Sequence, residues 1–462
     1  MTLPLGHPAS HSVFWVYAIM KHFSRFPVLL QAVCYGGAIS VAATSFLNLP
    51  AQASFQTNNP KAVLDEAWQI VNREYVDGSF NQVNWQAVRQ DLLSRSYTSP
   101  QQAYLALRQA LEQLNDPYTR FLDPDQYQSL TNQTTGELSG VGIRLRVDTQ
   151  TKVLTVVEPI ANSPASAAGI QQGDQILAID GRSTEGMSVE TASDLIKGEA
   201  GTKITLRLDR ASDVGGAFDL SLTRARIELL NVHHQVRQEG RERVGYIRLT
   251  EFSSHAPAQM KTAIQSLLAQ KVDGFVLDLR GNPGGLLQAS IDISRMWLDN
   301  GSIVRTVDRD GNSEDIKANH SALTQLPLAV LVDGNSASSS EILTGALMDN
   351  HRAVIVGTRT FGKALVQSVH ALSDGSGLAV TVAHYYTPGG TDISHRGITP
   401  DVEVSMNDQQ RQTLSSNAAL VGTTSDPQYA QAINALRLPI AQNHLPLAQP
   451  VSLGQERSER SF

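Results

Sequence analysis

The sequence has almost no cysteine and none of the common metal-binding motifs. Among its 462 residues the one cysteine, Cys34, lies in an apolar segment near the N-terminus. Histidines are scattered, with one adjacent pair at His233-His234, and neither a His-Glu-x-x-His nor a Cys-x-x-Cys motif is present. This composition argues against a disulfide framework, thiol catalysis and a zinc site, so we predict that no residue serves as a metal ligand.

Long basic runs are also missing from the chain. The formal net charge is −7 at pH 7, which argues against a nucleic-acid-binding protein. With 41% apolar and 18% charged residues, the composition is that of an ordinary globular protein. A chain of this length predicts roughly two to four domains.

An apolar segment near the N-terminus runs from about residue 26 to residue 49. It ends at Ala51-Gln52-Ala53, a small-x-small pattern that is typical of signal-peptide cleavage. We therefore predict that residues 1–53 form a secretory signal peptide, with Met20 as an alternative start. An uncleaved membrane anchor is the other interpretation. Cleavage after Ala53 would give an exported protein without cysteine and without stable membrane insertion.

Residues 54–134 carry apolar side chains at helical spacing. One series runs from Ala62 to Val71 and a second from Tyr104 to Leu114. The Asn115-Asp116-Pro117 step is expected to end the second helix. We predict an N-terminal helical region, and the sequence assigns no chemistry to it.

From about residue 135 the pattern changes to short strands. The run Gly173-Asp174-Gln175-Ile176-Leu177-Ala178-Ile179-Asp180-Gly181 follows two of them. The predicted elements are strands at 140–145, 153–157 and 203–208 and a helix at 191–197. This order resembles a PDZ domain of the circularly permuted kind found in bacterial proteases, and we place it at residues 135–224. Such a module captures a C-terminal carboxylate with backbone N–H groups and adds the peptide as an extra strand.

The PDZ resemblance implies a set of peptide-binding residues. A loop would hold the carboxylate and a pocket would hold the last side chain of the peptide. The loop residues are Gly140, Val141, Gly142 and Ile143, and Ile143, Leu195 and Ile196 would line the pocket. The alternative is that Val141 and Ile143 are strand core and the glycines form a bulge. The partners implied are protein substrates with free C-termini.

Residues 225–406 alternate between strands and helices. We predict strands at 244–249, 274–280, 328–332 and 353–356, and helices at 256–270, 286–298 and 342–348. This alternation predicts an α/β layered core with parallel strands, whose C-terminal turns carry the site. Residues 407–462, rich in Gln, Asn and Ser, are predicted to be a peripheral C-terminal tail with one helix at 427–436 and a disordered end.

Two turns and a lysine in this region carry candidate chemistry. Ser336–Glu341 places four hydroxyls at a strand-to-helix turn, where a nucleophile is exposed, although most single serines there are only N-caps. Lys363 has apolar neighbours, and desolvation lowers an ammonium pKa as a general base requires; a surface lysine is the alternative. Gln367, four residues on, would share a face with it. Gly281–Gly285 is either a tight turn or a source of oxyanion-hole N–H groups.

Taken together these features resemble the carboxyl-terminal processing peptidases, also called tail-specific proteases. The motifs that carry the resemblance are Asp116-Pro117-Tyr118-Thr119, the PDZ segment, Asp278–Gly285, Ser336–Glu341, Gly357–Lys363 and His395–Asp401. The resemblance covers about residues 60–405. It implies a Clp protease/crotonase-like α/β core with an inserted PDZ domain and an N-terminal helical region. It also implies a serine–lysine peptidase that needs no cofactor.

Residue by residue, the resemblance assigns roles to five residues. Ser338 matches the family nucleophile, Lys363 the base and Gln367 the glutamine that positions the base. Gly284 and the N–H of Ser339 match the oxyanion hole. The sequence would thus supply all reacting groups of an acyl transfer.

The sequence departs from the family pattern at three positions. Ser336 replaces a threonine, Ser339 an alanine, and Ala364 the glycine after the lysine. None of these changes removes a reacting group. Because extra hydroxyls flank the proposed nucleophile, Ser340 stays as its rival.

Other functions remain open at this stage. A Ser-His-Asp triad would use a histidine as the base, and the candidates are His351, His370, His384 and His395. A PDZ scaffold with an inactive hydrolase domain and an acyl-thioester enzyme are the remaining classes. For an exported peptidase the expected location is the periplasm or the thylakoid lumen. In a photosynthetic bacterium the resemblance implies maturation of a photosystem II reaction-centre precursor. In another bacterium, periplasmic quality control and turnover of cell-wall enzymes are equal alternatives. The oligomeric state is left undetermined.

Overall fold

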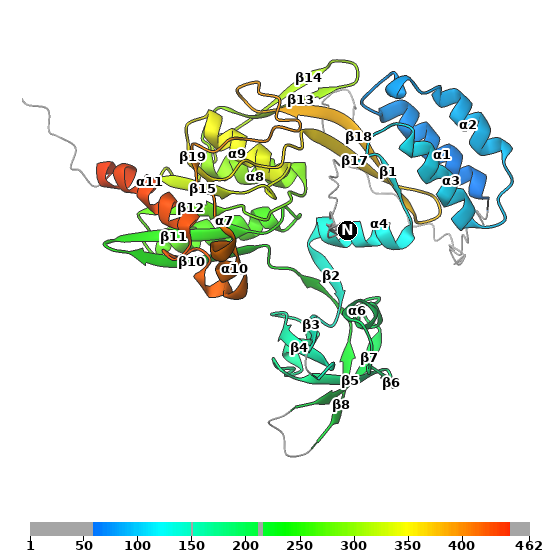
Figure 1. The fold of residues 1–462 in the computed structure, drawn as a ribbon, viewed down its shortest axis with the longest axis horizontal. Coiled ribbons are helices and arrows are strands. Elements are labelled where there is room, and N and C mark those ends of the chain that lie inside the picture. The colour runs from blue at the N-terminus through cyan, green and yellow to red at the C-terminus, as the bar shows by residue number, and fades with distance from the viewer. Residues whose placement is uncertain (1–58, 149–150, 211–215, 444–462) are drawn as a thin grey trace, which may run out of the picture. The chain divides into compact units, whose positions relative to one another are not determined.

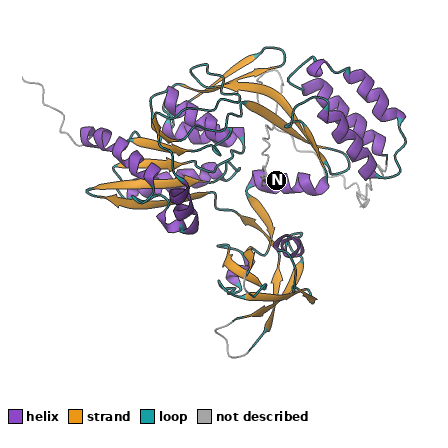
Figure 2. Ribbon diagram, viewed as in Figure 1, coloured by secondary structure: helices purple, strands orange, loops and turns teal. Residues whose placement is uncertain are grey.

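A computed structural model of the chain describes residues 59–148, 151–210 and 216–443 (Figures 1 and 2). The predicted signal peptide, Cys34 and the predicted disordered end lie outside these ranges. The described chain divides into two compact units. One contains Ser129–Val366 and the chain from Ala383, and the other contains the chain up to Gln128 together with Gln367–Val382. In the described ranges no helix combines the length and the apolarity that a membrane span requires.

The unit that contains the N-terminal region is built mainly on helices, which are purple in Figure 2. These are α1 (Pro60–Glu74), α2 (Trp85–Ser94) and α3 (Pro100–Glu112), and a short 3₁₀ turn lies at Phe80–Gln82. The side chains of Asn59 and Ser99 cap α1 and α3, each of which begins with proline, a combination typical of helix starts. Trp68 stacks on Trp85 with ring centroids 6.4 Å apart.

Strand β1 (Arg120–Leu122) and parts of β17 (Leu365–Ala371) and β18 (Gly377–Tyr386) complete this unit. Strand β1 pairs antiparallel with residues 377–379 of β18. Strand β17 pairs with β18. The predicted N-terminal helices thus pack in a common core with a piece of chain from far downstream. Helix α4 (Pro124–Thr135) follows β1.

The PDZ region is an antiparallel sheet with two short helices. Its strands, in the order β3-β4-β5-β7-β8, are Ile143–Val147, Leu154–Pro159, Gln175–Ile179, Lys203–Asp209 and Phe218–Thr223, with β6 (Arg182–Ser183) beside β5. The helices are α5 (Pro164–Ala167) and α6 (Val189–Ile196). At its entrance and exit, β2 (Glu137–Gly140) pairs with β9 (Ala225–Glu228).

The single strand predicted for 140–145 is wrong. Strand β2 ends at Gly140 and β3 begins at Ile143. Between them Gly142 has a φ of +79°, and a Cβ on it would lie 2.3 Å from Cβ of Ser163. Only glycine fits this turn, which separates the two strands.

The core is a six-stranded sheet in the order β10-β11-β12-β15-β16-β19, seen at the left of Figure 1. Its strands are Val232–Glu239, Glu242–Leu249, Gly274–Asp278, Leu328–Val332, Val354–Gly357 and Val402–Glu403. The first pair is antiparallel and all later pairs are parallel, which confirms the predicted α/β core. A hairpin, β13 (Ser302–Asp308) and β14 (Ser313–Lys317), pairs with residues 383–386 of β18.

Helices cover both faces of this sheet. On one face lie α7 (Ala256–Ala269) and α8 (Leu287–Trp297), and α9 (Ser339–Asp349) packs beside α8. Phe275 of β12 meets Trp297 of α8 edge-on at 5.2 Å. The alternate residue Val276 points to the other face, in the cluster formed with α11 (Pro427–Asn443). Burial on both faces explains why these strands are continuous apolar runs.

The peripheral position expected for the chain after residue 407 is wrong for α11. After α10 (Asp408–Ser416) and a 3₁₀ turn at Ala418–Leu420, this helix packs against β12, β15 and β16. Tyr429 is fully buried and meets Tyr246 edge-on at 5.8 Å. The sheet face would otherwise expose its apolar side chains to water, and this burial holds the C-terminal region in the core.

Candidate active site

The serine cluster lies where β15 passes into α9. Three of its four hydroxyls donate to backbone carbonyls: Ser336 to Leu279 at 2.8 Å, Ser339 to Gly285 at 3.1 Å, and Ser340 to Asn282 at 2.9 Å. Among the described residues, the hydroxyl of the fourth, Ser338, donates to no such group. Within the described chain, Ser338 is therefore the serine of this turn whose hydroxyl is not committed to a backbone carbonyl.

Ser338 also has an unusual backbone. Its φ is +54° and its ψ is −106°, a region that non-glycine residues rarely adopt. The next residue, Ser339, is the first of α9, so its N–H lies at the positive end of the helix. Strain of this kind persists only where neighbouring bonds enforce it, and it clusters at functional sites.

Glu341 accepts the hydrogen bonds that hold this turn in its strained conformation. Its Oε2 accepts from the N–H of Ser338 at 2.8 Å and from that of Lys363 at 2.9 Å. Its Oε1 accepts from the hydroxyl of Thr360 at 2.6 Å and from the N–H of Gly362 at 2.7 Å. Burial raises the pKa of Glu341, while these hydrogen bonds oppose the rise. One fully buried carboxylate thus ties the serine turn to the lysine segment.

Lys363 is 4% exposed, in contrast with a surface lysine. Its backbone is held on both sides, because its N–H donates to Glu341 and its carbonyl accepts from the Tyr385 hydroxyl. The preceding Gly362 has a φ of +92°, and a Cβ there would lie 2.8 Å from the Arg396 nitrogen. The lysine therefore sits in a closely packed segment directly before β17.

The glycine turn after β12 is held by Asn282, which is fully buried. The Asn282 side chain donates to the carbonyl of Leu249 and accepts from the N–H of Gly284 at 2.8 Å. A Cβ on Gly285 would lie 2.3 Å from the Phe252 carbonyl oxygen, so the turn needs glycine at this position. In this structure the Gly284 N–H is engaged by Asn282.

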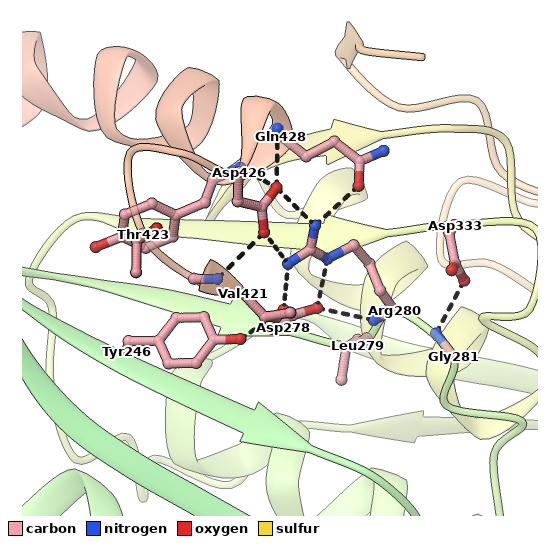
Figure 3. A network of polar contacts seen from close by, with 12 residues as sticks. Tyr246, Asp278, Leu279, Arg280, Gly281, Asp333, Val421, Thr423, Asp426 and Gln428 are labelled. Carbon is pink, nitrogen blue, oxygen red and sulfur yellow. Dashed lines mark hydrogen bonds and ion pairs between the residues drawn. The ribbon is translucent and has the colours of Figure 1, made fainter. Parts of the chain in front are cut away.

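Arg280 anchors the start of the same turn, as Figure 3 shows. Its guanidinium donates to Asp278 and to Asp426, with shortest distances of 2.6 and 2.7 Å. Gln428 accepts a further bond at 3.0 Å, and the Tyr246 hydroxyl donates to Asp278 at 2.7 Å. Burial alone would lower the pKa of Arg280, but the two carboxylates hold it well above its usual range. The C-terminal segment is thereby fastened to the turn.

Gln367 belongs to the other unit and is fully buried in β17. Its Nε2 lies 3.5 Å from the hydroxyl oxygen of Thr381. Its Oε1 is buried and accepts no hydrogen bond from any described residue. Thr381 in turn donates to Asp116 at 2.7 Å.

The predicted peptide-binding residues of the PDZ region lie around β3 and α6, which contact each other. Val141 and Ile196 are buried in the core of the domain, whereas Ile143 and Leu195 are partly buried against it. The Val141 carbonyl accepts from Ala165 at 2.9 Å. The structure thus brings these residues together at one end of α6, and both interpretations of the loop stay open.

Arg224 holds the end of α6 in place. It donates to the carbonyls of Leu195 and Ile196 at 2.9 and 3.0 Å. It also donates to the carbonyl of Lys203 at 3.0 Å. The last carbonyls of a helix have no partner within the helix, and this side chain supplies one.

The histidine candidates lie in other surroundings. His351, His384 and His395 are exposed, and His370 forms an ion pair with Glu74 at 2.8 Å, which lowers the pKa of Glu74 to about 2. In the described ranges no histidine forms a hydrogen bond or an ion pair with Ser338. Within the same ranges no cluster of three or more His, Cys, Asp or Glu side chains is arranged to hold a metal ion.

Comparisons with known proteins agree with this fold and these motifs. The model of peptidase family S41 matches residues 243–404, and the PDZ domain model matches residues 129–209. A solved structure described as a photosystem II D1 C-terminal processing protease has 36% sequence identity and a TM-score of 0.51. The alignment covers 80% of this chain and 99% of that one. The fold and its motifs therefore define a peptidase that carries a PDZ domain.

Relatives that align over most of their own length identify the family within this class of peptidases. The carboxyl-terminal-processing protease of Synechocystis sp. is 42% identical over 93% of this chain and 95% of its own length. The chloroplastic C-terminal processing peptidase of Tetradesmus obliquus is 38% identical over 77% of this chain and 79% of its own. The chain belongs to the carboxyl-terminal-processing proteases of peptidase family S41.

Proposed function

We propose that this protein is an exported serine endopeptidase in which Ser338 is the nucleophile and Lys363 is the general base. The observation that carries the proposal is the Glu341 carboxylate, which binds the N–H groups of both residues. The hydroxyl bonds of Ser336, Ser339 and Ser340 to backbone carbonyls support Ser338 over its neighbours, including the rival Ser340. The low exposure of Lys363 supports a neutral amine.

The proposed chemistry is acyl transfer. The neutral amine of Lys363 takes the hydroxyl proton as Oγ of Ser338 attacks the peptide carbonyl carbon. When the C–N bond breaks, the lysine ammonium gives this proton to the leaving amine. Water then hydrolyses the acyl-enzyme, with the lysine again as base, and the free serine is restored. Gln367 orients the amine throughout.

Backbone N–H groups would stabilise the negative charge that develops on the carbonyl oxygen. The N–H of Ser339 at the start of α9 is one donor, and each such donor lowers the activation barrier by roughly 3 kcal/mol. The N–H of Gly284 is the second. Because Asn282 accepts from it at 2.8 Å, Gly284 must exchange this partner for the oxyanion.

The PDZ domain would select substrates by their free C-terminal carboxylate. The N–H groups of the Gly140–Ile143 loop would bind the carboxylate, and Ile143, Leu195 and Ile196 would contact the last side chain. The relatives from Synechocystis sp. and Tetradesmus obliquus, the latter chloroplastic, and the structural neighbour that processes D1 support one physiological substrate. We propose that the protein matures the photosystem II D1 precursor in the thylakoid lumen or periplasm.

Cleavage of a peptide with a free C-terminus, and of its C-terminally amidated form, tests these assignments. We expect Ser338→Ala and Lys363→Ala to lose cleavage by a factor of at least about 1,000, since both act in the chemical step. Ser340→Ala is the matched control and keeps most of the activity. Activity retained in Lys363→Ala, or lost equally in both serine variants, would contradict the proposed catalytic pair.

The amidated peptide tests recognition of the chain end separately. Loss of the carboxylate is expected to raise KM and leave kcat for bound peptide nearly unchanged. Equal cleavage of both peptides would count against selection by the PDZ domain. If the protein fails to trim a D1 precursor but cleaves other substrates with free C-termini normally, only the proposed physiological substrate is refuted.

A further inference from the structure

A buried chain of hydrogen bonds runs from Asp116 to Gln367, and all its members lie in the same compact unit. Oδ2 of Asp116 accepts from the hydroxyls of Thr119 and Thr381, each at 2.7 Å. Oγ1 of Thr381 lies 3.5 Å from Nε2 of Gln367, at the outer end of the hydrogen-bond range. Thr119, Thr381 and Gln367 are almost completely buried. The chain thus joins the end of the helical region to β17.

The direction of each bond follows from counting protons. A carboxylate only accepts, so both threonine hydroxyls give their single proton to Asp116. The Oγ1 atom of Thr381 then has only acceptor capacity left toward Gln367, which must present its NH₂ group. The N–H of Thr381 donates to Oγ1 of Thr119 at 3.0 Å, the direction that this arrangement requires. The charge of Asp116 therefore fixes which way the Gln367 amide faces.

This orientation turns the amide oxygen of Gln367 away from Thr381. The oxygen is buried and accepts no hydrogen bond from the part of the chain that the structure describes. Buried carbonyl oxygens in proteins nearly always accept a bond, so a donor is expected to reach this one during function. Under the proposed function this donor is the amine of Lys363, four residues upstream in the sequence.

We propose that Asp116, acting through Thr381, is a positioning residue that holds the Gln367 amide oxygen ready to accept from the general base. The inference rests on the proposed function, in which Lys363 is that base. Asp116 touches neither substrate nor the reacting atoms. It sets the donor-to-acceptor direction of the hydrogen-bond chain, and this direction sets the orientation of the Gln367 amide.

Asp116→Asn tests this polarity because it changes charge but hardly any volume. The N–H of Tyr118 donates to Oδ1 at 2.9 Å, so the asparagine oxygen stays there and its NH₂ group faces the two threonines. Thr381 then receives a bond and is free to donate its own proton to Gln367. The glutamine would reverse and present NH₂ to the lysine, which needs an acceptor.

We expect Asp116→Asn to lower kcat by at least about tenfold with little change in KM, because only the base is misoriented. In a Gln367→Ala background the same substitution is expected to change kcat less than about twofold, because no amide remains to reverse. Thr381→Val breaks the chain and should match Asp116→Asn, whereas Thr381→Ser keeps the hydroxyl and restores activity. Thermal unfolding of each variant records any loss of stability.

Asp374→Asn is the matched control. Asp374 lies in the same unit and accepts from Tyr104 at 2.6 Å, but it does not belong to this chain of bonds. Its variant should keep wild-type kcat. The inference would be overturned if Asp116→Asn lowered kcat equally with and without Gln367, or lowered it in neither background.

Lys363→Ala in the same assay separates this inference from the proposed function. Retained cleavage in Lys363→Ala would refute the serine–lysine mechanism itself. If Lys363→Ala abolishes cleavage but the effect of Asp116→Asn on kcat does not depend on Gln367, only the positioning role of Asp116 is refuted.

Discussion

At the scale of single residues, the site depends most on one buried carboxylate. Glu341 accepts four hydrogen bonds, two on each oxygen, from groups on both sides of the proposed reaction centre. An amide cannot reproduce this arrangement, because an NH₂ group in either position faces two donors. The carboxylate is therefore a requirement of the turn rather than an ordinary helix-capping group.

Glu341→Gln is expected to destabilise the protein by roughly 2–5 kcal/mol, since two buried donors lose their acceptor. It should also lower kcat strongly, because the Ser338 and Lys363 backbones are no longer held. Urea unfolding and peptide cleavage measure the two effects. Glu314→Gln, at an exposed position of β14, is the control and should behave as wild type. A Glu341→Gln protein of normal stability and activity would contradict this account.

Residue identity alone predicted much of the candidate site, but few of its contacts. The serine turn, the lysine and the glutamine stand within 30 or so positions of one another in recognisable motifs, and a local pattern suffices to find them. Glu341 is visible in the motif, but its four donors are not. The contact between Asp116 and Thr381 leaves no trace in the local sequence around either residue, because they lie 265 positions apart.

At the scale of elements, the end of α6 is held by a side chain from outside the helix. Arg224, just before β9, donates to the carbonyls of Leu195 and Ile196. A Cβ on the nearby Gly198 would lie 2.8 Å from its Nε, so the contact is close. The position of α6 relative to β3 thus depends on this arginine.

Arg224→Ala is expected to weaken binding of a free-ended peptide about tenfold, if α6 and β3 form the peptide groove as proposed. KM should rise while kcat changes little, because the residue is remote in sequence from the catalytic turns. Isothermal titration with the Ser338→Ala protein isolates the binding step. Arg207→Ala, which removes an exposed arginine of β7, should bind normally. Unchanged affinity in Arg224→Ala would refute the role of this clamp.

A second element, the chain before α11, is fastened to the glycine turn. Asp426 and Gln428 both bind Arg280, whose side chain is 10% exposed. Removing one partner of a buried ion pair leaves charge without full compensation. The C-terminal segment therefore belongs to the machinery that shapes the turn containing Gly284.

Asp426→Asn is expected to cost about 2–4 kcal/mol of folding stability and to lower kcat through the turn. Asp408→Asn is the control, because Asp408 is 99% exposed in its own ion pair with Arg411, and its loss should cost under about 0.5 kcal/mol. Differential scanning calorimetry compares the two variants. Similar unfolding of both would show that Asp426 acts as a surface residue.

At the scale of the whole molecule, two carboxyl groups give stability opposite dependences on pH. Burial raises the pKa of Glu251 to about 7, and the His370 ion pair lowers the pKa of Glu74 to about 2. Glu251 favours the folded state below its unfolded pKa, and this contribution is lost as pH rises to 7. Glu74 contributes above its unfolded pKa, and this contribution is lost as pH falls.

We expect folding stability to decrease by roughly 2–3 kcal/mol between pH 4.5 and pH 7 because of Glu251. Glu251→Gln should flatten this dependence, whereas Glu314→Gln should leave it unchanged. Chemical unfolding at several pH values measures the slope. An unaltered slope in Glu251→Gln would assign the effect to other groups.

The sequence by itself determined the class of protein and the parallel core, and it predicted the residues that we propose to react. These features rest on apolar periodicity, on glycine turns and on motifs, all of which act between near neighbours in the chain. Only the tertiary structure decided that α11 covers the sheet, that Asp426 binds Arg280 and that Asp116 reaches Thr381. Those contacts join distant segments, and their formation depends on which buried polar groups need a partner once the chain has folded.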